Sequence, residues 1–315
     1  MKNIIIYIYL YIKFIKYRKG KNYFYNSNIK NLIPNWNNKN AEIWLNYSLS
    51  SNQRGDLVAD TIEKYGFQIH NKYFLDVGSA YGGFPIAFAK RGAKSYGLEI
   101  SKNLIQISLD NFKDNKIYPK IFELDITDKQ VQKKINQKFD IITCNDVIEH
   151  VKNPKLAIKN MSSLLNPGGI LYMEIPNKNY PPFVLEDGHY QMFGLSQLNR
   201  SQAETYFKIY YPDMNYGVEY YLELNEYKEI FNKNNLNIKV IDESYKYFNI
   251  KYLEKVKNEI QQRLKEFTLP QNTKIESLVK SKVRTYLRNY DLNIKSNNFK
   301  QTYGTDFWKI ICKKI

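Results

Sequence analysis

The chain has 315 residues, of which 43% are hydrophobic and 15% aromatic. This length provides for a large packed core, and the composition excludes an intrinsically disordered chain and a membrane protein with many spans. The formal net charge of +16 belongs mainly to the two ends, because residues 23–250 contain 26 basic and 25 acidic side chains. The net charge is therefore weak support for a nucleic-acid partner.

The two cysteines, Cys144 and Cys312, lie in apolar runs. They are too few for a disulfide framework or a cysteine-rich zinc site, which favours the cytoplasm. At the N-terminus, the apolar run Ile4–Ile12 is followed by basic residues. It is shorter than the about 20 residues that span a bilayer, and no small-residue cleavage site follows it. Two interpretations of residues 1–22 stay open: a peripheral anchor on the inner face of the membrane, or an ordinary element packed on the domain.

Short apolar runs alternate with helical segments through the middle of the chain. The expected strands are 72–77, 95–100, 120–124, 139–144 and 170–175, and the expected helices are 41–65, 85–90, 104–111 and 155–165. A helix at 222–232, a strand at 237–242, mostly helical structure over 250–290 and a strand at 306–312 follow. This alternation predicts an α/β fold with a doubly wound, mostly parallel sheet.

The same pattern predicts a division of the chain into segments. They are the N-terminal segment 1–22, a helical region 23–66, the core 67–177, a lid insertion 178–221, a core helix and strand 222–243, a basic helical insertion 244–304 and a last core strand 305–315.

The glycine-rich stretch FLDVGSAYGGF, residues 74–84, joins a predicted strand to a predicted helix. Glycines allow the backbone to approach a ligand closely, and a helix N-terminus favours an anionic group. The acidic Asp76 would repel a bound pyrophosphate, whereas it would attract the ammonium and sulfonium groups of S-adenosylmethionine. The loop therefore favours that cofactor over a dinucleotide.

This loop and four later strand ends resemble the class I S-adenosylmethionine-dependent methyltransferases. The family's loop reads acid-x-Gly-x-Gly-x-Gly, and Ala80 stands in place of its middle glycine. The resemblance implies a seven-stranded Rossmann-like sheet with helical cap insertions. It also implies cofactor contacts from Asp76, Gly78, Ala80, Gly82, Glu99 (ribose hydroxyls), Asp125 (adenine amino group), Ile126 (adenine ring), Asn145 and Asp146 (methionine end). A surface turn is the alternative for Asp125, and a solvated helix position is favoured for Arg54.

The run NDVIEHV resembles the DVLEHV segment of the ubiquinone-biosynthesis O-methyltransferases, and it contains His150. His189 lies in LEDGHYQMFGL, which is similar to methyltransferases encoded among surface-polysaccharide genes. Both histidines are candidate general bases, because imidazole titrates in the range needed to deprotonate a hydroxyl. Capping or packing of the following helix is the alternative for His150. Asp146, Glu149 and His150 could hold a divalent metal, although no metal site is predicted.

The sequence thus predicts methyl transfer from S-adenosylmethionine to an oxygen of a glycan, glycolipid or small molecule. The alternatives are an RNA methyltransferase that uses the basic C-terminal helices, and a membrane-associated binding protein with a vestigial cofactor site. A small-molecule or glycan acceptor is favoured over nucleic acid, because the N/D-P-P-aromatic motif of base amino-group methylation is absent after the fourth strand.

Overall fold

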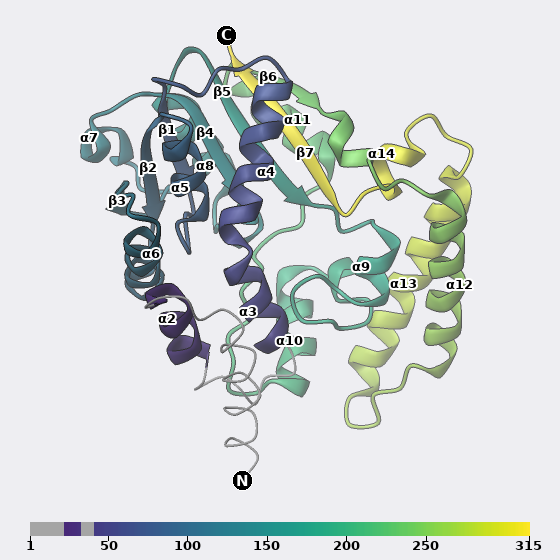
Figure 1. Cartoon of the computed structure of the whole chain (residues 1–315). Coiled ribbons are helices and arrows are strands. Elements are labelled where there is room, and N and C mark those ends of the chain that lie inside the picture. Colours follow the sequence, from purple (N-terminus) through teal and green to yellow (C-terminus); the bar gives the residue numbers. More distant parts are fainter. Residues whose placement is uncertain (1–21, 33–40) are drawn as a thin grey trace. The chain divides into compact units, whose positions relative to one another are not determined.

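The computed structural model describes residues 22–32 and 41–315 (Figure 1). Of the segment 1–22, for which a membrane anchor is one interpretation, residues 1–21 lie outside the described residues. Contacts divide the described chain into two compact units. The first extends to Lys72 and includes Ser79–Glu123, and the second contains Tyr73–Gly78 and Leu124–Ile315. The helices of the described residues include none that is long and apolar enough to cross a membrane.

The first unit pairs strand β2 (Lys94–Glu99) in parallel with β3 (Lys120–Glu123). Its helices are α2 (Tyr23–Leu32), α3 (Ala41–Leu49), α4 (Ser51–Lys64), α5 (Gly83–Lys90) and α6 (Lys102–Asn115). The region predicted as helical over 41–65 is helical in the structure, and an interruption at Ser50 divides it into α3 and α4. The Ser50 hydroxyl donates to the carbonyl of Tyr47 at 3.0 Å, and such local bonds compete with helix continuation.

Helices α4 and α5 approach each other closely at two glycines. A Cβ atom on Gly55 would lie 2.7 Å from the carbonyl oxygen of Gly83, and one on Gly83 would lie 2.3 Å from the backbone carbon of Ser51. Gly83 therefore serves helix packing.

The second unit contains strands β1 (Tyr73–Val77), β4 (Phe139–Asn145), β5 (Leu165–Pro176), β6 (Leu236–Val240) and β7 (Phe307–Lys314). Their order is β1-β4-β5-β7-β6. Strands β1, β4 and β5 are parallel, and β7 runs antiparallel to both of its neighbours. With seven strands among the described residues, the expected fold class, a mostly parallel Rossmann-like sheet flanked by helices, is confirmed.

Strand β5 begins earlier than predicted. Leu165 pairs with Phe139, and the ladder then resumes where Ile170 pairs with Ile141. The intervening residues 166–169, which the sequence predicts as a helix-ending turn, form a bulge within the strand. Gly168 adopts a positive φ of +74° there, a conformation that glycine takes without strain.

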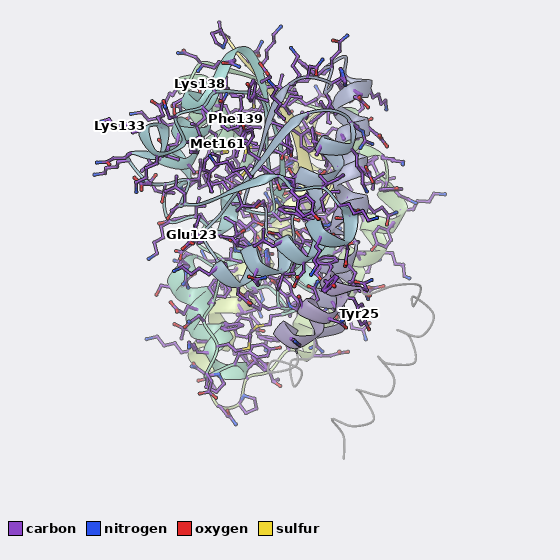
Figure 2. The ribbon with its side chains drawn as sticks, turned by 60° about the vertical axis from the view of Figure 1, so that its left-hand side comes forward. Tyr25, Glu123, Lys133, Lys138, Phe139 and Met161 are labelled. Atoms are coloured by element: carbon purple, nitrogen blue, oxygen red, sulfur yellow. The ribbon has the colours of Figure 1, made fainter. Side chains whose placement is uncertain are left out.

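Helices α7 (Val131–Ile135), α8 (Pro154–Leu164) and α11 (Leu224–Lys233) belong to the sheet region of the second unit. The side chain of Asn153 caps α8 by accepting from the backbone N–H of Leu156 at 3.0 Å. Phe139 of β4 and Met161 of α8 are fully buried, whereas Lys133 of α7 projects at the edge (Figure 2).

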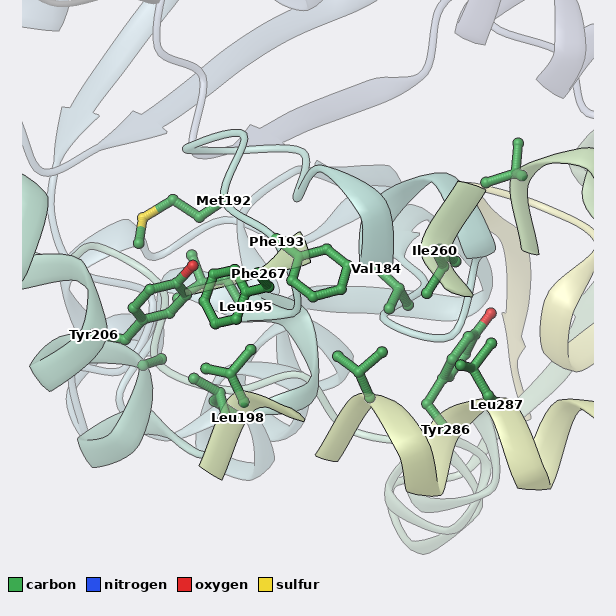
Figure 3. Close-up of a cluster of buried hydrophobic side chains, with 14 of the residues drawn as sticks. Val184, Met192, Phe193, Leu195, Leu198, Tyr206, Ile260, Phe267, Tyr286 and Leu287 are labelled. Atoms are coloured by element: carbon green, nitrogen blue, oxygen red, sulfur yellow. The ribbon is translucent and has the colours of Figure 1, made fainter. Parts of the chain in front are cut away.

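The remaining helices form a cap with its own core (Figure 3). They are α9 (Pro181–Leu185), α10 (Arg200–Tyr210), α12 (Ile250–Glu266), α13 (Thr273–Asn293) and α14 (Phe299–Tyr303), with the short turn η3 (Leu195–Gln197). Helices α12 and α13 lie side by side and are joined by an ion pair between Lys257 and Asp291. Phe267 contacts both Phe193 and Tyr206 in the core of this cap.

Candidate functional site

In the first unit, the glycine-rich loop is tied to the end of β2. The Glu99 carboxylate accepts a 2.9 Å hydrogen bond from the backbone N–H of Ala80. Its other oxygen accepts from the N–H groups of Ile100 and Ser101, both at 2.9 Å. The structure therefore brings together Ala80 and Glu99, two of the predicted cofactor contacts. Three backbone donors thus pair with a carboxylate that is only 6% exposed.

In the part of this loop that belongs to the first unit, two residues adopt left-handed conformations. Ala80 has a φ of +40° and Gly82 a φ of +74°. A Cβ on Gly82 would lie 2.4 Å from Cε1 of Phe112, so that position requires glycine. The hydroxyl oxygen of Ser79 is buried without a hydrogen-bond partner in the described chain, a feature that the sequence did not single out. The guanidinium of Arg54 lies 3.6 Å from the ring centroid of Tyr47.

In the second unit, the carboxyl ends of β1 and β4 carry Asp76 and Asn145. Asp76 accepts a 2.6 Å hydrogen bond from the hydroxyl of Thr143. The side-chain oxygen of Asn145 is buried and has no hydrogen-bond partner among residues 22–32 and 41–315. Buried acceptors are rarely left unpaired, so this oxygen is suited to a ligand donor. A Cβ on Gly78 would lie 2.3 Å from Cγ2 of Val147, and Asp146 has a φ of +54°.

Asp125 and Ile126 lie in a turn after β3. Asp125 is exposed, and its carboxylate accepts from both the backbone N–H and the hydroxyl of Thr127 at 2.7 Å. Ile126 is buried, and its carbonyl accepts from the side-chain amide of Asn160 at 2.6 Å. Asp125 therefore lies in an exposed turn that follows β3.

Both candidate bases of the second unit converge on one carboxylate. His150 lies at the end of the turn η2 (Ile148–His150), and His189 lies in the loop after α9. The Nε2 atoms of both imidazoles are 3.7 Å from Oε1 of Glu149. Glu149 is 1% exposed, and within the described residues neither of its carboxylate oxygens has a hydrogen-bond partner. The structure therefore brings together a buried acid and two imidazoles.

Burial and neighbouring charges shift the pKa values of Glu149 and His189 in opposite directions. Burial acts to raise the pKa of the Glu149 carboxyl, but the imidazoles of His189 and His150 outweigh it and hold this pKa below its usual value. Burial acts to lower the pKa of the His189 imidazole, and the Glu149 carboxylate outweighs it and raises this pKa. The closeness of Glu149 and His189 thus favours the charged carboxylate of Glu149 and the charged imidazole of His189.

The loop that carries His189 is fixed by a buried carboxylate. Asp187 is 2% exposed and accepts from the backbone N–H groups of His189, Tyr190 and Met192 at 2.9–3.1 Å. The hydroxyl of Tyr221 lies 2.8 Å from Nδ1 of His189. No local sequence pattern places Asp187 or Tyr221 beside a candidate histidine, so neither could be predicted from the sequence.

The cluster has the composition of a divalent-metal site. The ligand atoms of Glu149, His150 and His189 all lie within 4.8 Å of one another. Two imidazoles and a carboxylate suit ions such as Zn²⁺ and Fe²⁺, and the unpaired oxygens of Glu149 fit a cation. In place of the sequence-derived set of Asp146, Glu149 and His150, the structure groups His189 with Glu149 and His150.

Residues 51–240 match the sequence model of a family described as a methyltransferase domain. The chain belongs to this methyltransferase family. The prediction of a class I methyltransferase is therefore confirmed, and S-adenosylmethionine is the methyl donor that this membership implies.

Two curated relatives are ubiquinone biosynthesis O-methyltransferases. The protein from Coxiella burnetii is 33% identical over 116 residues, which are 37% of this chain and 48% of the relative. The protein from Actinobacillus pleuropneumoniae is 28% identical over 128 residues, 40% of this chain and 55% of the relative. The chain thus spans about half the length of these relatives. Among solved structures, a magnesium protoporphyrin IX methyltransferase from Synechocystis has a TM-score of 0.43 and 19% identity, over 61% of this chain and 75% of that chain.

Proposed function

We propose that this chain transfers the methyl group of S-adenosylmethionine to a hydroxyl oxygen of a small acceptor. The observation that carries this proposal is the convergence of His150 and His189 on the buried carboxylate of Glu149. A hydroxyl is a weak nucleophile until its proton is removed, and imidazole near a carboxylate is suited to accept that proton.

For the cofactor, the proposal assigns contacts in each unit separately. In the first unit, Glu99 would accept from ribose hydroxyls, and the backbone of Ala80 and Gly82 would approach the cofactor. In the second unit, Asp76, Gly78, Asn145 and Asp146 would contact its methionine end. The unpaired buried oxygen of Asn145 supports this, because the cofactor's ammonium group is a strong donor. Ile126 and Asp125 would contact the adenine.

The proposed transfer is a single displacement. The acceptor oxygen forms a bond to the methyl carbon, the carbon–sulfur bond breaks, and its electron pair stays on sulfur, which becomes a neutral thioether. The acceptor's hydroxyl proton passes to Nε2 of His150. His150 is the more accessible of the two imidazoles, with 36% of its side chain exposed against 15% for His189. The main work of the protein is to align the acceptor with the methyl group and exclude water.

Glu149, His150 and His189 would hold a divalent cation if the enzyme uses one. Such a cation would lower the pKa of a bound hydroxyl. In either case the charge of Glu149 would stabilise a proton taken up by the imidazoles, and Asp187 would fix the loop that presents His189.

For the acceptor, a glycan or glycolipid hydroxyl is the class that the sequence favours. Tyr190 and Tyr221 flank His189, with ring centroids 6.1 Å and 6.2 Å from its imidazole. Aromatic faces of this kind suit the apolar faces of sugars or of a ring-bearing acceptor. A cytoplasmic location, with peripheral membrane contact through residues 1–22, completes the proposal.

The test is the transfer of labelled methyl groups from S-adenosylmethionine by the purified chain, with fractionated cell extract as the source of acceptors. We expect label in the glycan or small-molecule fraction that is lost with the His150→Gln variant. Label confined to RNA would overturn the proposal, and so would transfer that His150→Gln leaves unchanged. Binding of S-adenosylmethionine by calorimetry separates a missing acceptor from a missing cofactor site.

A further inference from the structure

We infer that Tyr190 is a positioning residue that acts through Gly217 to hold His150 in one tautomer, with its proton on Nδ1 and its Nε2 lone pair facing Glu149. The inference rests on the proposed function only for its effect on turnover. The tautomer itself is a property of the protein alone.

His150 is hydrogen-bonded to the backbone of Gly217. Nδ1 of His150 lies 2.8 Å from the carbonyl oxygen of Gly217. A carbonyl oxygen can only accept, so the hydrogen of this bond is on Nδ1. In a neutral imidazole the other nitrogen then carries the lone pair. That nitrogen, Nε2, is the one that faces Glu149 at 3.7 Å.

Gly217 is in turn held by the side chain of Tyr190. Its backbone N–H donates to the hydroxyl oxygen of Tyr190 at 2.8 Å. Gly217 is therefore held on both sides, by Tyr190 at its N–H and by His150 at its carbonyl. A Cβ at this position would lie 3.2 Å from the Tyr190 hydroxyl, so a larger residue would press on the contact.

Tyr190 is itself held in place by neighbouring rings and by Asp187. Its ring lies 4.6 Å from that of Phe207 and 5.4 Å from that of Tyr216, measured between centroids. Its backbone N–H donates to the carboxylate of Asp187 at 3.1 Å. Burial also raises the pKa of its hydroxyl, which keeps the hydroxyl neutral at physiological pH. Tyr190 is thus a fixed acceptor for the Gly217 N–H.

The segment after Gly217 is tied to the same turn as His150. The carbonyl of Glu149 accepts from the backbone N–H groups of Glu219 at 2.7 Å and Tyr220 at 3.1 Å. These bonds persist when Tyr190 is changed, because they involve backbone atoms only. Removal of the Tyr190 hydroxyl is therefore expected to loosen Gly217 without releasing the whole segment.

The bond to Gly217 determines which ring nitrogen of His150 carries the lone pair. Nitrogen protonation in histidine is set by the hydrogen bond that the other ring nitrogen makes. With Nδ1–H committed to Gly217, Nε2 stays available to a proton or a cation beside Glu149. A less firmly held Gly217 would let the imidazole populate the other tautomer, which places a hydrogen on Nε2.

The test is nitrogen-15 NMR of the imidazoles, at a pH where they are neutral and without added metal or substrate. The chain has three histidines, so the signals of His150 can be assigned with a His150→Gln variant. We expect the wild type to show a protonated Nδ1 and an unprotonated Nε2, and Tyr190→Phe to show a mixture of tautomers. Tyr210→Phe is the matched control, because Tyr210 lies on α10 with 52% exposure, and it should match the wild type.

A second variant, Gly217→Ala, would place a Cβ 3.2 Å from the Tyr190 hydroxyl and should also produce a mixture of tautomers. A wild-type His150 with its proton mainly on Nε2 would overturn the inference, as would Tyr190→Phe spectra identical to the wild type. If methyl transfer is measurable, Tyr190→Phe should lower kcat about three- to tenfold and leave the KM for S-adenosylmethionine unchanged. Absence of methyl transfer with the expected NMR result would contradict the proposed function and leave this inference standing.

Discussion

The imidazoles of His150 and His189 meet edge to face, with centroids 5.0 Å apart and planes at 83°. His150 ends the turn after β4, whereas His189 belongs to the loop after α9 in the cap. The buried carboxylate of Glu149 lies between them, 3.7 Å from each Nε2. The cap loop therefore contributes directly to the group of residues that we propose to act on the acceptor.

Replacement of His150 should separate chemistry from cofactor binding. His150→Gln removes the proposed base while retaining a side chain of similar length. We expect kcat to fall about 10²–10⁴-fold, the usual contribution of general-base catalysis, with unchanged affinity for S-adenosylmethionine. Initial rates and calorimetry measure the two quantities. His70→Gln is the control, because His70 is an exposed histidine of the first unit. Equal losses of rate and affinity would indicate a structural role for His150.

Removal of the Glu99 carboxylate should weaken cofactor binding. Glu99→Ala deletes the acceptor of three backbone N–H groups, and a charge-assisted bond contributes roughly 1.5–3 kcal/mol. We expect the Kd for S-adenosylmethionine to rise more than tenfold. Thermal unfolding without cofactor measures the structural share of the effect. If Kd is unchanged, the ribose assignment is wrong.

The proposed cation capacity of the cluster can be tested with metal alone. We expect Zn²⁺ or Mn²⁺ to raise the melting temperature of chelator-treated protein, and Glu149→Gln to abolish this shift. Glu174→Gln is the control, because Glu174 carries a carboxylate on β5 outside the cluster. A shift that is the same in Glu149→Gln and the wild type would place the cation elsewhere.

Gly78 should tolerate no side chain, for two separable reasons. Its φ of +72° alone costs alanine about 1–2 kcal/mol, and its Cβ would lie 2.3 Å from Val147. Gly168→Ala is the matched control, because Gly168 has a φ of +74° and nothing within 4 Å of a Cβ. Chemical denaturation should show a larger loss of unfolding free energy for Gly78→Ala than for Gly168→Ala. Val147→Ala should recover part of the difference, and equal losses would exclude the clash.

The two thiols should be unreactive in the folded protein. Burial raises the pKa of Cys144 and Cys312 above the usual 9.0, which lowers the thiolate fraction. We expect iodoacetamide to modify neither thiol at pH 8 until the protein unfolds. Above about pH 9, the unfolded chain loses these protons and the folded chain keeps them, so the free energy of unfolding should fall as pH rises. Rapid modification of the native protein would contradict this burial.

The central strands of this fold could be predicted because they are short, buried apolar runs, as in 139–144 against the observed Phe139–Asn145. Helix α10 was missed inside the aromatic-rich segment 178–221, where tertiary packing of Tyr206 and Phe207 decides the conformation. His150 and Glu149 stand in a recognisable motif. Their pairing with His189, Tyr221 and Gly217 depends on the course of the cap, which no local pattern encodes.

The antiparallel strand β7 separates β5 from β6, and β6 pairs with no other strand of the described chain. During synthesis, β6 therefore leaves the ribosome well before the strand that joins it to the sheet. Until Phe307–Lys314 emerges, the edge of β5 and both edges of β6 have exposed backbone donors and acceptors. Completion of the sheet must therefore wait until Phe307–Lys314 is made, and until then these unpaired edges are open to pairing with other chains.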